Sequence, residues 1–192
     1  MTPDIQREPI PRDESHSLVN ALTALKSQLL DTAQTCQLLD RSAQLQGGAP
    51  AYSDLLQHAA DAQHLAHGVI QLTADFTGSP HSTTHAGPTV LTHLATATSM
   101  SSLAAAHFAE SAEHALSLPR PSNPAVRRYL ETRMLVDHSS ARAFLRRASE
   151  SLRDAAKELE DPLNVHRNRP FPKPAWRQSP EPPQPAPNPS RR

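Results

Sequence analysis

The chain has 192 residues, and its 19 lysines and arginines balance 19 aspartates and glutamates, so its formal net charge is zero at pH 7. Only 4% of the residues are aromatic and only 5 are glycine, whereas 19 are proline. This composition excludes an all-β chain rich in glycine turns and favours alanine- and leucine-rich helices separated by prolines, while the single cysteine, Cys36, excludes an internal disulfide.

The amino-terminal residues 1–14 contain three prolines, and we expect them to form a disordered arm. They lack the basic start and apolar stretch of a secretory signal. No segment of the chain approaches the ~18 consecutive apolar residues that a membrane span needs. We therefore expect a cytoplasmic protein that does not contact a membrane.

Four proline-free segments carry apolar residues in alternating steps of three and four. This spacing places the apolar residues on one face of a helix. A proline inside a helix costs about 3 kcal/mol, so the prolines between the segments mark helix boundaries. Asn123 followed by Pro124 is a typical helix start, with Asn as the N-cap and Pro at the first helical position. The predicted helices span about residues 16–46, 51–77, 88–118 and 124–161.

The similar helix lengths and mostly short connections predict an all-α fold, an up-down-up-down antiparallel four-helix bundle over residues 15–161. The following segment, residues 162–192, contains ten prolines, six basic residues and one acidic residue. It has too little apolar surface to offset the entropy of ordering, so we predict a disordered proline- and arginine-rich tail. The tail is either a linear binding motif or a passive extension.

Asp137 stands at the centre of the apolar face predicted for the fourth helix, where a carboxylate needs a partner. Counting about 1.5 Å per residue from the helix ends places His107 at the same level, with Cys36 within one turn of it. A buried polar layer is therefore expected, which either fixes the helix register or forms a Cys-His-Asp nucleophile site; the remaining alternative is that Asp137 is exposed. The absence of an obvious oxyanion hole favours the structural interpretation, and we assign no catalytic residue. The predicted members of the layer are Thr32, Cys36, His107 and Asp137.

Eleven histidines raise the question of a metal site. Four polar residues recur at every third position of the second predicted helix: His58, Asp61, His64 and His67. The last three point away from the apolar face, which is typical of a polar helix surface. On the third predicted helix His107 and His114 are seven residues apart, about 10 Å along the axis, which is too far to share an ion. We therefore assign no metal ligand and no cofactor.

Basic residues form a stripe opposite the apolar face of the fourth predicted helix, and more follow in the tail. Such a stripe is either a solvated face with pairs four residues apart or an electrostatic footprint for nucleic acid or another polyanion. Zero net charge and the absence of a known nucleic-acid-binding motif favour the solvated face. The candidate polyanion contacts are Arg128, Arg142, Arg146, Arg153, Lys157, Arg167, Arg169, Lys173 and Arg177.

The outward face of the third predicted helix carries small uncharged residues, although solvent-facing helices normally carry charges there. Small residues permit close approach of another helix, whereas a hydroxyl-rich surface can also be solvated as it stands. The predicted interaction face consists of Thr92, Ser99, Ser102, Ala106 and Ala109. We expect a non-catalytic bundle that acts through protein contacts, with a partner protein or a second copy of itself. Polyanion binding is the first alternative, and metal or small-molecule binding is the second.

Overall fold

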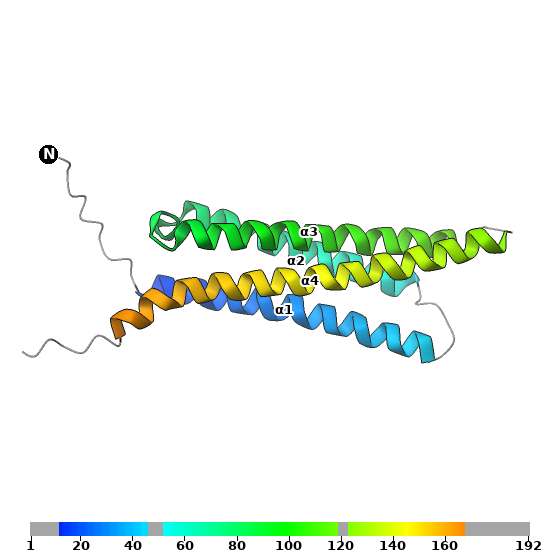
Figure 1. Ribbon diagram of the computed structural model, residues 1–192, viewed down its shortest axis with the longest axis horizontal. Helices are drawn as coiled ribbons and strands as arrows, with labels where there is room; N and C mark the ends of the chain where they lie inside the picture. The colour runs from blue at the N-terminus through cyan, green and yellow to red at the C-terminus, as the bar shows by residue number, and fades with distance from the viewer. Residues whose placement is uncertain (1–11, 46–51, 119–122, 168–192) are drawn as a thin grey trace, which may run out of the picture.

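The described part of the chain consists of four long helices and one short one: α1 (Arg12–Leu45), α2 (Tyr52–Gly78), the 3₁₀ helix η1 (Pro80–Thr83), α3 (Gly87–Ser117) and α4 (Pro124–Arg167). The computed structural model describes residues 12–45, 52–118 and 123–167, without the side chains of residues 12, 37–45 and 161–167. Successive long helices run antiparallel, as the ribbon in Figure 1 shows.

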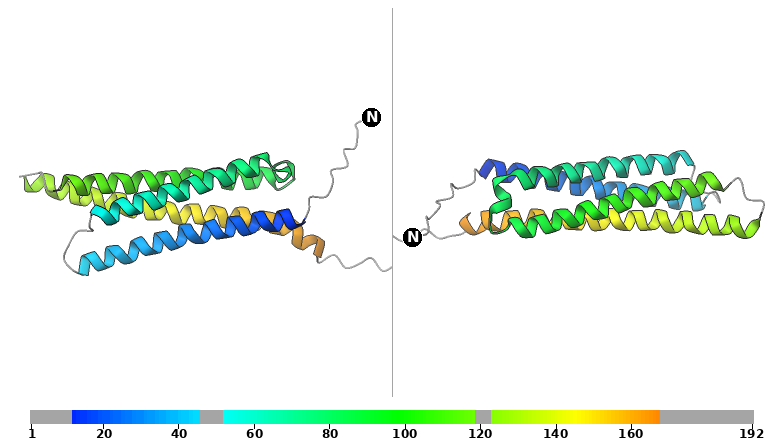
Figure 2. Two further views of the ribbon diagram at one scale, coloured as in Figure 1. Left: turned by 180° about the vertical axis from the view of Figure 1, so that it is seen from behind. Right: turned by 90° about the horizontal axis from the view of Figure 1, so that it is seen from above.

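Each long helix packs on two others. The contacts join α1 to α2, α2 to α3, α3 to α4, and α4 back to α1. This closed ring is the predicted up-down-up-down four-helix bundle, and the prediction of the fold is confirmed. The hairpin of α3 and α4 projects beyond the ends of α1 and α2 at the end where α3 meets α4, which the two views of Figure 2 also show.

The core lies along the middle of the bundle and is built mainly from leucine and alanine. Burying one large aliphatic or aromatic side chain stabilises the fold by roughly 1.5–3 kcal/mol. Because every long helix keeps a polar side, none in the described ranges is apolar over a length that could cross a membrane. The largest fully buried apolar side chains are Phe76, Phe108, Leu22, Leu29, Leu55, Leu94, Leu145 and Leu152.

The helix starts and stops follow the sequence signals closely at the central connections. The Asn123 side-chain oxygen accepts a hydrogen bond from the Ala125 N–H at 2.8 Å, which confirms the predicted N-cap of α4. Likewise α2 ends at Gly78, and a proline lies in the first turn of α3. Val126, which the apolar spacing places on the inner face, is 45% exposed near the start of α4.

The outer boundaries differ from the prediction. The first helix begins at Arg12 rather than near residue 16, and α4 continues through Pro162 to Arg167 instead of ending at residue 161. Pro162 has no N–H to donate to the carbonyl four residues earlier, so the helix continues past it at the cost of that backbone hydrogen bond. Asp13 and Glu14 lie in the first turn of α1, where the helix dipole favours negative charge. The rest of the predicted arm and tail lies outside the described residues.

Candidate metal centre

Polar side chains from all four long helices meet at one level of the bundle. Adjacent residues of a helix point about 100° apart, so the consecutive residues Asp137 and His138 of α4 face different neighbours. Both are buried. The level therefore holds two clusters, which we call inner and outer. The inner cluster consists of Cys36, His58 and His138, and the outer cluster consists of His107, Glu110 and Asp137.

The inner cluster brings together one sulfur and two imidazole rings. One potential ligand atom from each of Cys36, His58 and His138 lies within 4.8 Å of the other two, and all three residues are buried. The Nδ1 atom of His58 is 3.1 Å from the Nε2 atom of His138. A hydrogen bond between two ring nitrogens requires that one of them carry no proton, so at least one ring is neutral.

An apolar ring closes one side of the inner cluster. The ring centroid of Phe108 on α3 lies 5.8 Å from that of His58 and 5.0 Å from that of His138, the latter in an edge-on arrangement. Phe108 is itself fully buried. The two imidazoles therefore sit in an apolar environment, where each polar atom needs a specific partner.

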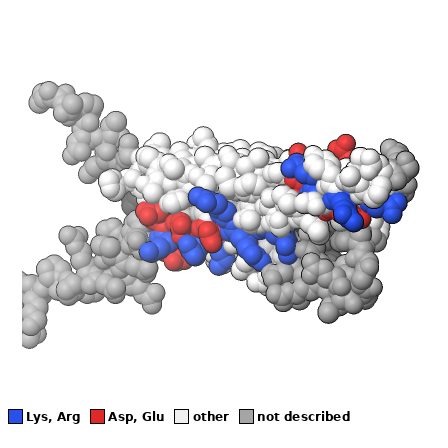
Figure 3. Space-filling model, turned by 45° about the vertical axis from the view of Figure 1, so that its right-hand side comes forward, with Lys and Arg blue, Asp and Glu red and all other residues white. Residues whose placement is uncertain are grey.

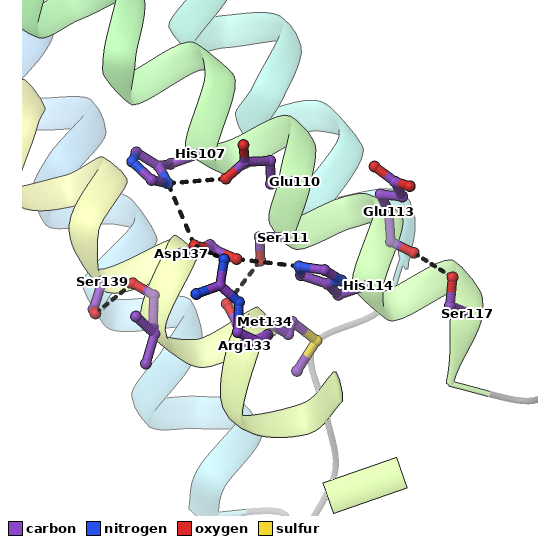
Figure 4. Close-up of polar contacts among 11 residues, drawn as sticks. His107, Glu110, Ser111, Glu113, His114, Ser117, Arg133, Met134, Asp137 and Ser139 are labelled. Carbon is purple, nitrogen blue, oxygen red and sulfur yellow. Dashed lines mark hydrogen bonds and ion pairs between the residues drawn. The ribbon is translucent and has the colours of Figure 1, made fainter. Parts of the chain in front are cut away.

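The outer cluster is centred on Asp137, which is only 1% exposed. Its Oδ1 atom lies 3.3 Å from His107 Nδ1, and its Oδ2 atom lies 3.3 Å from His114 Nε2 (Figure 4). Arg133, one turn earlier on α4, places a guanidinium nitrogen 3.7 Å from Oδ1. The two oxygens of one carboxylate thus each lie next to a different histidine of α3.

His107 is held between two carboxylates. Its Nδ1 atom lies 3.1 Å from Glu110 Oε2 as well as 3.3 Å from Asp137 Oδ1, and its ring stacks on Phe144 at a centroid distance of 5.4 Å. The approach is close but poorly aligned: within the described residues, neither His107 Nδ1 nor Asp137 Oδ2 forms a hydrogen bond. His107 Nδ1 and Asp137 Oδ2 are therefore buried polar atoms that lie close to potential hydrogen-bond partners but form no hydrogen bond with them.

The predicted polar layer divides between the two clusters. The structure brings His107 to Asp137, but the groups that converge with Cys36 are His58 and His138. Thr32 is half-buried one turn before Cys36. The residues His64, His67 and Asp61 are exposed on α2, where the Asp61 carboxylate accepts a hydrogen bond from the Gln57 amide at 2.7 Å.

The predicted interaction face lies on the outside of α3. All five of its residues are exposed, and the neighbouring residue Thr96 is half-buried. The surface over α3 carries no charged side chain for most of its length, and Figure 3 shows it white along the upper side of the molecule. Leu103, on the same helix, is also exposed.

The basic stripe of α4 is interrupted by acidic neighbours. Arg128, Arg146 and Lys157 are exposed and Arg142 is half-buried, while the Arg153 guanidinium forms an ion pair with Asp154 at 2.9 Å. Figure 3 shows blue and red side chains mixed along this side of the molecule. The side chain of Arg167 lies outside the description, as do the tail residues Arg169, Lys173 and Arg177.

Sequence reasoning does not identify His58 and His138 as members of the site. The spacing of apolar residues nevertheless points to residue 138. On α4 the buried positions are four residues apart from Met134 to residue 138, and three residues apart from there to Ala141. Steps of three and four from Leu55 likewise pass through residue 58 on α2. A histidine at such a position interrupts the apolar pattern, so the pattern does not mark it as buried. On α4, the neighbouring Asp137 is identified as the buried polar residue in place of His138.

Comparisons of the chain with protein-family models, with curated proteins and with solved structures found no match. Its function is therefore inferred from the chemistry of the two clusters and of the exposed helix faces.

Proposed function

We propose that this protein is a helical bundle that binds a transition-metal ion in its core, with Cys36, His58 and His138 as ligands. The supporting observation is the convergence of one sulfur and two imidazoles from three different helices within 4.8 Å. A zinc ion bound by sulfur at about 2.3 Å and by nitrogen at about 2.0 Å spaces its ligands roughly 3.3–3.6 Å apart. The His58 Nδ1–His138 Nε2 distance of 3.1 Å is already close to this spacing, and the other ligand atoms need to approach by at most about an ångström.

The ligand set indicates the class of ion. Thiolate and imidazole suit copper and zinc, whereas magnesium and calcium prefer oxygen ligands. One thiolate neutralises Cu(I), while Zn(II) leaves a positive charge in an apolar core, where an uncompensated charge is costly. We therefore favour Cu(I), with Zn(II) as the second choice. A thiol ligand that is not in a disulfide also suits a reducing compartment such as the cytoplasm, which we propose as the location.

Titration with Co(II) tests the proposal, because a thiolate–cobalt bond gives a charge-transfer band. Cys36 is the only cysteine of the chain, so such a band reports this residue alone. We expect the band in the full-length wild type and its loss in Cys36→Ser, with Zn(II) and Cu(I) displacing the cobalt. His138→Gln weakens cobalt binding, and the exposed control His64→Gln leaves it unchanged.

The result that would overturn the proposal is a folded, reduced wild-type protein without a thiolate–cobalt band. The same conclusion follows if His138→Gln and His64→Gln bind cobalt as well as the wild type does. Circular dichroism of each variant shows whether the bundle remains folded. In either case Cys36, His58 and His138 form a structural polar cluster that fixes the packing of three helices.

A second candidate function is association through the interaction face of α3. The exposed Leu103 among small uncharged residues supports it, because an apolar side chain flanked by small ones permits close packing of a second helix. We expect light scattering to detect a dimer of the wild type and a monomer of the double variant Ser102→Arg, Ala106→Glu. A wild type that stays monomeric at high protein concentration contradicts this function.

Polyanion binding is less well supported, because acidic residues interrupt the basic stripe of α4.

A further inference from the structure

We propose that the outer cluster is a second metal site, which binds one divalent transition-metal ion such as Zn(II) through His107 Nδ1, Glu110 Oε2 and Asp137 Oδ1. It differs in chemistry from the inner cluster, because one nitrogen and two carboxylate oxygens replace the sulfur and the two imidazoles. It also differs in location, since it lies between α3 and α4 alone. The proposal does not depend on metal binding by Cys36.

The distances in the outer cluster match a coordination sphere. Zinc binds nitrogen and oxygen at about 2.0–2.2 Å, so the ligand atoms of a tetrahedral ion are about 3.3 Å apart. The Nδ1 atom of His107 lies 3.1 Å from Glu110 Oε2 and 3.3 Å from Asp137 Oδ1. Two edges of the tetrahedron are thus already at the required length, and stacking of the His107 ring on Phe144 holds the nitrogen in place.

The hydrogen bonding of these atoms is incomplete without an ion. His107 Nδ1 is a buried atom that forms no hydrogen bond within the described residues, although two carboxylate oxygens approach it. A buried polar atom without a hydrogen bond costs about 1–3 kcal/mol. An ion bound to Nδ1 and to both carboxylates removes this cost and replaces the poorly aligned contacts by directed bonds.

The charges around the cluster also favour a divalent cation. Asp137 and Glu110 are two carboxylates, and Arg133 supplies one compensating guanidinium at 3.7 Å from Asp137. With neutral histidines, the local charge is therefore negative. His114 approaches Asp137 Oδ2 at 3.3 Å, on the oxygen that the ion does not need, and therefore leaves Oδ1 to the ion.

The outer cluster is open to solvent on one side. The side chains of His107 and Glu110 are 28% and 50% exposed, whereas that of Asp137 is 2% exposed. An ion can therefore enter from water and leave its remaining coordination position to a water molecule. The imidazole nitrogen selects zinc or another transition metal over calcium and magnesium, which prefer oxygen ligands.

The test uses calorimetric titration of Zn(II) into the full-length Cys36→Ser variant, in which the inner cluster has lost its sulfur. We expect this variant to retain a zinc site, and Glu110→Gln in the same background to weaken it by more than about tenfold. Glu113→Gln is the matched control. It removes the same charge from the next turn of the same helix, but Glu113 does not contact Asp137 (Figure 4). We expect it to leave the affinity nearly unchanged.

A nitrogen-15 NMR spectrum of the histidines supplies a readout specific to the site. Zinc on His107 Nδ1 shifts that nitrogen and leaves the ring proton on Nε2, whereas calcium does not shift it. The proposal is overturned if zinc causes no shift of His107 in the folded protein, or if Glu110→Gln and Glu113→Gln weaken binding equally. The cluster is then an electrostatic contact between a histidine and two carboxylates. Failure of the inner site is seen separately, as a missing thiolate–cobalt band in the wild type.

Discussion

At the scale of single residues, Asp137 is a buried carboxylate surrounded by basic side chains. It is almost fully buried, and it touches His107 and His114 of α3 and Arg133 of α4. Its three partners are each partly exposed and keep some contact with water, so the carboxylate alone bears most of the desolvation cost. Removing the carboxylate and removing one of its partners should therefore change the free energy of unfolding by different amounts.

We predict that, in metal-free buffer, His107→Leu destabilises the protein by about 1–3 kcal/mol, because it leaves the buried carboxylate with fewer partners. Asp137→Leu has a smaller effect or none, since the basic side chains can turn to water. Urea unfolding of both single variants and of the double variant measures the difference. If His107→Leu is as costly in the Asp137→Leu background as in the wild type, the contact between the two side chains does not contribute to stability.

At the scale of elements, the connection from α2 to α3 is described in full and is held by hydrogen bonds within itself. Its hydroxyl side chains fold back onto the chain: Ser82, Thr83 and Thr84 each donate a hydrogen bond to a backbone oxygen three residues earlier. The Gly87 N–H then donates to the Thr84 carbonyl at 3.1 Å. A Cβ atom on Gly87 would overlap the backbone carbonyl of Ser82, so this position needs a glycine.

We predict that Gly87→Ala destabilises the protein by about 1–3 kcal/mol, because backbone rather than a flexible side chain must move. Gly68→Ala, in the middle of α2, is the control. Its new methyl group meets only the Leu25 side chain at 3.5 Å, an ordinary contact. Alanine is the better helix former, so this change should stabilise the protein by about 0.5–1 kcal/mol. Thermal unfolding of both variants checks that Gly87→Ala lowers the stability and Gly68→Ala raises it.

At the scale of the whole molecule, the inner cluster ties together helices that are distant in sequence. Its members come from α1, α2 and α4, and Phe108 of α3 packs against both imidazoles. An ion bound there would therefore hold the entire bundle closed at one level. The outer cluster, in contrast, joins only the neighbouring helices α3 and α4.

We predict that a metal ion that binds the inner cluster raises the free energy of global unfolding. An ion at 100 times its dissociation constant adds about 2.7 kcal/mol if it does not bind the unfolded chain. Chemical unfolding with and without Cu(I), under reducing conditions, measures the gain, and Cys36→Ser should abolish it. An equal gain in Cys36→Ser would mean that the stabilising ion is bound elsewhere.

Much of the architecture follows from local signals along the chain. Proline positions and the three-four spacing of apolar residues predict four helices and their order, because both depend only on neighbouring residues. The N-cap at Asn123 and the helix end at Gly78 are also local signals of this kind. The end of α4 is less well predicted, since the helix continues past Pro162 although a proline there removes a backbone hydrogen bond.

The sequence by itself also determines that Asp137 must meet a partner near the level of His107, because helix lengths and end points fix the height of each residue in an antiparallel bundle. Only the tertiary structure decides which way each residue faces at that height. Because α4 packs on α3 and on α1 together, its buried arc is wide enough to include both Asp137 and His138. The rotation of α4 about its axis then directs Asp137 to His107 and His138 to His58, and that rotation is set by the packing of all four helices rather than by any local pattern.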